Sequence, residues 1–209
     1  MYASREDAGQ KLGEFLKHEG LRAEIVLGLP RGGVIVAAEV ARVLGLPLDV
    51  LIVRKIGHPL HREYAVGAMA EGGVMVMDDR SAIRNPILKS QLDNVISEEQ
   101  ERLQQYEARF HHETPAPLAD KLVLLVDDGL ATGATTEAAV MAVRRQHARR
   151  IVVTAPVASL SAVERLRRCA DEVKVLILDP NFAAVGRYYQ NFPQTTDEEV
   201  LQALHGRNG

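Results

Sequence analysis

The chain has 209 residues, 46% of them hydrophobic and 25% charged, and a formal net charge of −3. This composition is typical of a soluble globular protein and excludes a disordered chain, and the length fits one α/β domain or two small ones. The charge does not indicate a nucleic-acid or membrane partner, and no apolar run reaches the ~20 residues of a membrane helix. The single cysteine, Cys169, cannot form an internal disulfide, and the charged N-terminal residues lack the apolar core of a signal peptide. We therefore expect a cytoplasmic protein.

The first half of the chain predicts helices and strands in alternation. Ser4 and Asp7 have the spacing of a helix N-cap pair, and apolar residues recur at helical spacing after them. The elements that follow are a buried strand over Ile25–Leu29, an apolar helix over Val34–Leu44, a strand over Leu48–Val53, a polar, turn-rich stretch from Arg54 to Glu63, and a hairpin of Tyr64–Ala70 with Val74–Met77 around Gly72 and Gly73.

The second half begins with one long amphipathic helix over Ile87–Phe110, where apolar residues repeat at three- and four-residue steps. Buried strands over Leu122–Val126, Ile151–Ala155 and Val173–Leu178 then alternate with helices near 133–147 and 160–168. This alternation predicts an α/β fold with a mostly parallel twisted sheet and helices on both faces.

Two adjacent carboxylates and a loop of small residues follow the predicted strand Leu122–Val126. The sequence LVLLVDDGLATGATT places Asp127 and Asp128 at the end of this strand and a helix after the loop. In a parallel sheet, ligands bind at the carboxyl ends of the strands, and the backbone N–H groups of 131–135 at a helix N-terminus would bind a phosphate. The carboxylates can accept hydrogen bonds from a vicinal diol, and one of them can help to hold a divalent cation. The pattern therefore predicts a ribose 5-phosphate site.

Other phosphate-binding motifs do not match. A P-loop needs Gly-Lys-Ser/Thr, whereas this loop reads Gly-Ala-Thr, and no Gly-x-Gly-x-x-Gly follows a strand. A second acidic pair, Asp78 and Asp79, also follows an apolar strand, but no Thr-Gly-x-Thr comes after it. We interpret that pair as a solvated turn.

The segment VDDGLATGAT resembles the signature of type I phosphoribosyltransferases. Those enzymes bind 5-phosphoribosyl 1-pyrophosphate (PRPP), usually with magnesium, and exchange its pyrophosphate for a base. The resemblance implies that Asp127 and Asp128 hold the ribose hydroxyls and contribute to a magnesium site, directly or through the ligand. The PRPP-binding residues that it implies in this segment are Asp127, Asp128, Ala131, Thr132, Gly133, Ala134 and Thr135. Ala134 stands where family members generally have a second glycine.

Two further segments resemble parts of the same family. Leu-Pro-Arg31-Gly32-Gly33 is similar to the pyrophosphate loop, because consecutive glycines allow the backbone to approach an anion and Arg31 supplies a counter-charge. Arg54 and Lys55 open a stretch that is similar to the mobile loop that closes over PRPP, where they would neutralise the departing pyrophosphate and exclude water. Arg62 is a weaker candidate for the same role, and Glu63 is a candidate proton acceptor.

The C-terminal part supplies the candidate acceptor site. In this family a hood of variable segments covers the base, and Phe182, Val185 and Tyr188 are the residues that we expect to contact it by stacking and edge contacts. Hydrophobic packing explains this cluster almost as well. The resemblance covers nearly the whole chain, as one domain over residues 1–209 with a helical insertion at 86–112 and a hood segment at 178–209.

The sequence leaves the acceptor open. Enzymes that act on 6-oxopurines usually carry an aspartate where Ala131 stands, which argues against hypoxanthine and guanine. The arrangement of the three motifs is most similar to bacterial phosphoribosyltransferase-like proteins of unknown acceptor. We expect a magnesium-dependent transferase that acts on PRPP and a nucleobase or related nitrogen heterocycle, as a homodimer and without nucleic acid or membrane. A regulator that senses PRPP without catalysis, or a hydrolase of PRPP or a nucleotide, are the alternatives.

Overall fold

A five-stranded parallel sheet lies at the centre of the protein. The computed structural model describes residues 1–77, 86–111 and 115–206. In this sheet the strand order is β2-β1-β6-β7-β8, and every neighbouring pair is parallel. The strands are β1 (Ile25–Gly28), β2 (Leu48–Val50), β6 (Leu122–Val126), β7 (Arg150–Ser159) and β8 (Glu172–Asp179). The predicted fold class is confirmed.

The order of the strands places a ligand crevice between β1 and β6. From β1 the chain moves outward to β2, and it later returns to the other side of β1 with β6. Open α/β sheets bind ligands outside the carboxyl ends of the strands where the order reverses in this way. The glycine loop follows β1 and the acidic pair follows β6, so both lie at this crevice.

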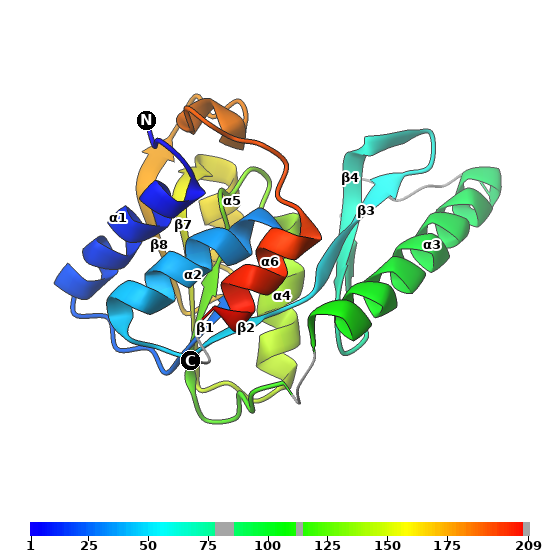
Figure 1. Cartoon of the computed structure of the whole chain (residues 1–209). Coiled ribbons are helices and arrows are strands. Elements are labelled where there is room, and N and C mark those ends of the chain that lie inside the picture. The colour runs from blue at the N-terminus through cyan, green and yellow to red at the C-terminus, as the bar shows by residue number, and fades with distance from the viewer. Residues whose placement is uncertain (78–85, 112–114, 207–209) are drawn as a thin grey trace.

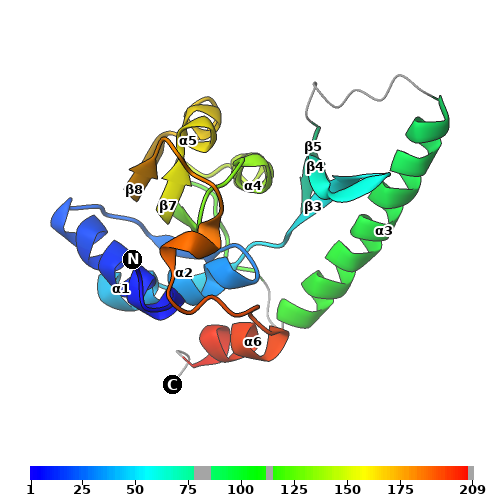
Figure 2. The same ribbon diagram turned by 90° about the horizontal axis from the view of Figure 1, so that it is seen from above.

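Helices cover both faces of the sheet (Figure 1). Seen from above, α1 (Arg5–His18) and α2 (Gly32–Leu44) lie on one face, and α4 (Ala134–Arg145) and α5 (Leu160–Leu166) lie on the other (Figure 2). β6 is buried at every position, as expected for a strand that is covered on both sides. At the start of α1, the Ser4 hydroxyl accepts a hydrogen bond from the Asp7 N–H at 3.4 Å, so the predicted N-cap is confirmed.

A separate antiparallel sheet and the longest helix form an arm that projects from the α/β body (Figures 1 and 2). The arm consists of β3 (Val53–His58), β4 (His61–Ala70), β5 (Val74–Met77) and α3 (Pro86–Phe110). Ile56 and Met69 of the strands pack with Val95, Leu103 and Phe110 of the helix in one apolar cluster. The predicted long helix and the β4–β5 hairpin are confirmed. Among the described residues, no helix combines the length and apolar character needed to cross a bilayer.

Two predictions in this region are wrong. The strand expected over Leu48–Val53 is divided: β2 ends at Val50 in the parallel sheet, and β3 begins at Val53 in the antiparallel sheet. The stretch from Arg54 to Glu63, expected as a turn-rich loop, is mostly the β3–β4 hairpin. Hydropathy could not separate the strands, because 48–53 is apolar on both sides of the break. The polar residues of this hairpin form strands because the backbones of β3 and β4 pair with each other.

The C-terminal part returns to the N-terminus of the chain. After β8 a short 3-10 helix, Val185–Tyr188, leads to an extended segment and to α6 (Asp197–His205), which packs against α2. Tyr2 pairs with Tyr189 in a parallel bridge, so the N-terminus is joined to the segment that follows β8. The sequence analysis did not predict α6, although Thr196 and Glu199 form a capping box at its start.

His111, directly after α3, pairs with Glu71 in the turn between β4 and β5, and this contact at the base of the arm can be tested. Its Nε2 lies 2.9 Å from Glu71 Oε2, and this bond raises the pKa of His111 above its ordinary value of 6.5. A raised pKa in the folded state adds stability that is complete below the ordinary value and is lost as pH rises through the folded value. We expect the free energy of unfolding to fall by about 1 kcal/mol more in the wild type than in His111→Gln as pH rises from the ordinary value of 6.5 through the raised folded value. Urea denaturation at each pH measures this, and parallel profiles for the two proteins would contradict it.

Candidate active site

Asp127 and Asp128 lie at the carboxyl end of β6, beside the N-terminus of α4. The Asp128 N–H donates to Asp127 Oδ1 at 2.8 Å, and the Thr136 hydroxyl donates to Asp127 Oδ2 at 3.5 Å. Burial, reinforced by the charge of Asp128, raises the pKa of Asp127 to about 8, and burial also raises the pKa of Asp128. Two adjoining carboxylates that are costly to ionise favour a ligand that brings hydroxyl donors or a cation to them.

The loop between these carboxylates and α4 has the geometry of an anion cradle. Gly133 has φ of +75°, a left-handed conformation that lets the chain turn directly into the helix. Ala131 and Thr132 are exposed, and the Ser159 hydroxyl holds the loop by donating to the Ala131 carbonyl at 2.6 Å. The exposed part of this loop therefore lies directly before the N-terminus of a 12-residue helix, where anions are favoured.

The glycine loop after β1 touches the acidic pair. A Cβ on Gly32 would lie 2.0 Å from Asp128 Oδ2, and a Cβ on Gly33 would lie 2.9 Å from the Val126 carbonyl oxygen. The peptide bond between Pro30 and Arg31 is cis. The structure thus brings together two segments that the sequence predicts for one ligand.

A cavity of about 560 Å³ joins these loops to the arm. Thr135 of the acidic loop, Pro30 of the glycine loop and Arg54, Lys55 and Arg62 of the arm line it. The residues with the opposite charge in its wall are Glu98 and Glu99 of α3. The cavity has an excess of cationic side chains and is suited to a polyphosphate.

Glu99 holds the position of Arg54. Glu99 is 6% exposed, and Arg54 Nε and Nη2 lie 2.9 and 2.8 Å from Glu99 Oε2. The Arg54 guanidinium also lies 5.3 Å from the centre of the Tyr106 ring, and Arg102 Nη1 lies 2.5 Å from Glu99 Oε1. Arg102 is a further cation of the same cavity that the sequence analysis did not single out.

Arg31 is placed differently. Its Nη1 lies 3.6 Å from Asp197 Oδ1 at the start of α6, and Asp197 Oδ2 lies 2.8 Å from Arg109 Nη1 of α3. Arg31 therefore faces a second cavity, of about 330 Å³, together with Arg109 and Asp197.

The three residues predicted to contact the base are only partly together at the site. Val185 is packed against the acidic loop, because a Cβ on Gly129 would lie 2.5 Å from Val185 Cγ1. Phe182 and Tyr188 instead stack on each other, with ring centres 5.5 Å apart, and the Tyr188 hydroxyl donates to Asp179. Their contact with a base stays a prediction.

Two residues beside Asp128 were missed by the sequence analysis. Arg5 Nε donates to Asp128 Oδ2 at 2.8 Å, and the Tyr189 hydroxyl donates to the Asp128 carbonyl oxygen at 2.6 Å. Arg5 is 123 positions and Tyr189 is 61 positions from Asp128 in the sequence, so no local pattern could have indicated either contact.

Some sequence predictions lie outside the described residues. Glu63 is in β4, but its side chain is not described, and Asp78 and Asp79 fall in the gap after β5.

Across the described ranges, no group of three or more His, Cys, Asp or Glu side chains is arranged to hold a metal ion. Burial raises the pKa of the Cys169 thiol, which agrees with an unreactive cysteine.

The fold and these loops define the class to which the protein belongs. The model of the phosphoribosyl transferase domain matches residues 6–191. The chain belongs to the phosphoribosyl transferase domain family, as the sequence resemblance predicted.

Individual relatives agree with this assignment. Curated proteins of two Mycobacterium tuberculosis strains, named provisionally as phosphoribosyl transferases, are 41% identical over 205 residues, which is 98% of this chain and 46% of theirs. The chain thus spans about half the length of these relatives. The crystal structure of TT1426 from Thermus thermophilus is similar with a TM-score of 0.80 and 44% identity, over 100% of this chain and 99% of that one. A purine phosphoribosyltransferase of Pyrococcus horikoshii shares the fold, with a TM-score of 0.50 and 18% identity over 92% and 95% of the two chains.

Proposed function

We propose that the protein transfers the 5-phosphoribosyl group of PRPP to a nucleobase or related nitrogen heterocycle and releases pyrophosphate. The observation that supports this most is the cavity of about 560 Å³, which is lined by Pro30 of the glycine loop, by Thr135 at the start of α4 and by the cations of the arm. The excess of cationic side chains in this cavity suits the pyrophosphate of PRPP, and the acidic loop beside it suits the ribose hydroxyls and the 5-phosphate.

Each segment has a separate role in this proposal. Asp127 and Asp128 accept hydrogen bonds from the ribose hydroxyls, and the loop 131–135 with the N-terminus of α4 binds the 5-phosphate. A ring nitrogen of the acceptor forms a bond to C1 of the ribose as the bond from C1 to the pyrophosphate oxygen breaks. Arg54 and Lys55 stabilise the charge that collects on the pyrophosphate, with Gly32 and Gly33 allowing a close approach of the backbone. The proton of the ring nitrogen passes to a base, for which Glu63 is the candidate.

Magnesium fits this site only as a shared ion. Asp127 and Asp128 provide two carboxylates, and a hard divalent ion takes six or more oxygen ligands, so the remaining ligands would come from PRPP and water. A magnesium ion held in this way would neutralise part of the phosphate charge.

The acceptor is proposed to bind beside Val185, under the C-terminal segment 178–209. Val185 lies against the acidic loop, and so the space next to it is close to the ribose. The helical insertion 86–112 supplies the cavity wall that holds Arg54 in place. A cytoplasmic location and a homodimer stay predictions, and gel filtration with light scattering tests the second.

Calorimetric titration of PRPP into the wild-type protein, with and without magnesium, tests the proposal. We expect binding that depends on magnesium and, in a second assay, pyrophosphate release that depends on an added heterocycle. Release without a heterocycle would indicate a hydrolase, and binding without any release would indicate a sensor. If PRPP does not bind under either condition, the proposed function is wrong.

Lys55 provides a test of the arm. It is an exposed residue of the cavity wall, so its removal should not disturb the core. We expect Lys55→Ala to lower kcat about a hundredfold, with a smaller change in KM for PRPP, because the charge it stabilises develops as pyrophosphate leaves. Arg42→Ala, which removes an exposed cation paired with Glu39 on α2, is the matched control. Equal kcat in the two variants would remove Lys55 from the reaction.

A further inference from the structure

Arg5 occupies a position that is unfavourable for an arginine. It is the first residue of α1, where the helix dipole disfavours a cation, and it is only 9% exposed. Arginine is almost never buried unless its charge is paired. The helix gains nothing from Arg5 here, so the reason for its placement lies in what the side chain contacts.

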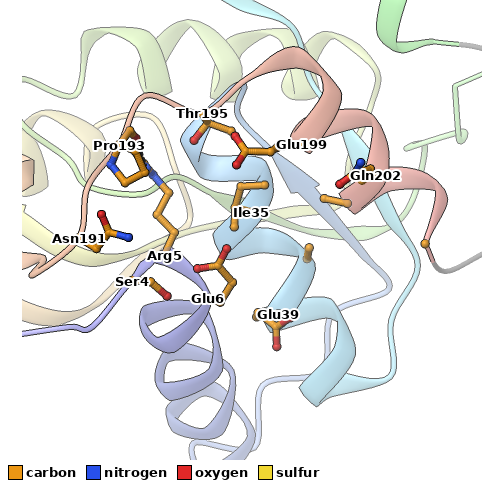
Figure 3. A pocket seen from close by; sticks show the side chains of 13 residues that line it. Ser4, Arg5, Glu6, Ile35, Glu39, Asn191, Pro193, Thr195, Glu199 and Gln202 are labelled. Atoms are coloured by element: carbon orange, nitrogen blue, oxygen red, sulfur yellow. Dashed lines mark hydrogen bonds between the residues drawn. The ribbon is translucent and has the colours of Figure 1, made fainter.

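The contacts of Arg5 fix its guanidinium on three sides. Nε donates to Asp128 Oδ2 at 2.8 Å, and Nη1 donates to the Pro193 carbonyl oxygen at 2.7 Å. The Phe192 ring covers the guanidinium, with its centre 3.8 Å from the central carbon. Figure 3 shows Arg5 extending from α1 toward Pro193 in the C-terminal segment. Since Arg5 cannot rotate without losing all three contacts, it holds the Asp128 carboxylate in one orientation.

A second set of contacts holds the Asp128 backbone from the same side. The Tyr189 hydroxyl donates to the Asp128 carbonyl oxygen at 2.6 Å. Tyr189 is held in turn by Tyr2, whose ring centre lies 5.5 Å away and whose N–H donates to the Tyr188 carbonyl oxygen at 2.7 Å. The first helix and the C-terminal segment thus act together on one acidic residue.

The enclosure of Asp128 is asymmetric. Oδ2 accepts the hydrogen bond from Arg5 and packs directly against Gly32, since a Cβ on Gly32 would lie only 2.0 Å from it. A hydroxyl donor that approaches Asp128 would therefore meet Oδ1. When one oxygen of a carboxylate is held by the protein and the other accepts from a ligand, a ligand with a hydroxyl donor gains one hydrogen bond over a ligand without it.

We propose that Arg5 is a positioning residue that orients Asp128 Oδ1 toward a ribose hydroxyl, so that the site selects a ribose phosphate over other phosphates. This inference rests on the proposed function and deepens it, because it assigns the recognition of the sugar to contacts that α1 and the segment after β8 make with Asp128. The phosphate cradle at α4 is a different element, and the contacts of Arg5 given above do not include it. The two parts of the ligand can therefore be tested separately.

The test compares ribose 5-phosphate with inorganic phosphate by calorimetry, in the wild type and in Arg5→Gln. We expect Arg5→Gln to bind ribose 5-phosphate about tenfold more weakly, the usual effect of losing one hydrogen bond to a charged group, with phosphate binding changed less than about twofold. The ratio of the two affinities is the decisive measurement, because a general loss of folded protein would lower both affinities alike. Lys11→Gln, which removes an exposed cation from the same helix, is the matched control and should leave the ratio unchanged.

Two further variants keep the test decisive if Arg5→Gln unfolds. Arg5 also lines a cavity of about 510 Å³ between α1, α2 and α6, so a shorter lysine can be solvated there (Figure 3). We expect Arg5→Lys to keep part of the selectivity, and Phe192→Leu, which leaves the ion pair in place, to reduce it less than Arg5→Gln does. If Arg5→Gln has the same ratio of ribose 5-phosphate to phosphate affinity as the wild type, the inference is wrong while the proposed function stands. If Arg5→Gln does not fold, the same ratio in Arg5→Lys decides. If the wild type binds neither PRPP nor ribose 5-phosphate, both fail.

Discussion

Asp127→Asn is expected to bind PRPP about a hundredfold more weakly than the wild type and to lose turnover at least in proportion. The asparagine has the same shape: its Oδ1 can accept from the Asp128 N–H, and its Nδ2 can donate to the Thr136 hydroxyl oxygen, which reverses the direction of that bond. It lacks the charge that attracts magnesium and strengthens hydrogen bonds from the ribose hydroxyls. Calorimetric titration of PRPP with magnesium, followed by pyrophosphate release, measures both effects.

The same substitution is expected to stabilise the protein without ligand. The pKa of Asp127 is raised from 3.8 to about 8, so its ionised form is disfavoured in the folded state relative to the unfolded chain. Because the folded pKa is the higher one, the wild type has its full stability below the ordinary pKa and loses part of it as pH rises through the folded value. Asparagine does not ionise, and we expect the variant to be more stable by roughly 2 kcal/mol at pH near 8, with the difference vanishing near pH 4.

Weaker PRPP binding together with higher stability in Asp127→Asn distinguishes a ligand-binding carboxylate from one that only supports a turn. A carboxylate that only supported the loop would make the protein less stable when replaced. Urea denaturation of both proteins across this pH range, without PRPP, decides between the two. A variant that is less stable at every pH would show that Asp127 has a structural role.

The acidic loop and the sheet were predictable because their signals are local. The strand Leu122–Val126 is a continuous apolar run, and Asp127 follows it directly, so its position at the carboxyl end of a parallel strand required no knowledge of the tertiary structure. The glycine loop after β1 was predictable for the same reason. Their contact through Gly32 and Asp128 depends on β1 and β6 being neighbours, which the sequence indicated only through the family resemblance.

The arm, and the contacts of Arg5 and Tyr189 with Asp128, depend on residues that are distant in the sequence and so leave no local pattern. Arg54 was expected in a loop because its neighbours are polar, whereas pairing with Met69 across the arm makes this segment a strand. Its partner Glu99 is one of many acidic residues on an amphipathic helix, and only the three-dimensional structure shows that this one is buried. Arg5 likewise reads as an ordinary charged residue at the start of a helix. Each of these side chains is defined by a partner from a distant part of the chain.

Gly32→Ala is expected to damage the site more than any other single methyl group added to these loops. The new Cβ would lie 2.0 Å from Asp128 Oδ2 and 2.6 Å from Arg5 Nε, distances that no real contact tolerates. Either the ion pair between Arg5 and Asp128 separates or the glycine loop moves away from the acidic pair. Both outcomes leave Asp128 misplaced, and we expect PRPP affinity to fall about a hundredfold and the free energy of unfolding to fall by about 2–4 kcal/mol.

Gly20→Ala is the matched control for this substitution. Gly20 has φ of +68° and nothing within 4 Å of an added Cβ, so alanine there costs about 1 kcal/mol of backbone strain and touches no part of the site. Its PRPP affinity should equal that of the wild type. If Gly32→Ala already separates Arg5 from Asp128, Arg5→Gln in the Gly32→Ala background should cost less stability than Arg5→Gln alone. Strict additivity of the two changes in unfolding free energy would show that the loop, and not the ion pair, takes up the added methyl group.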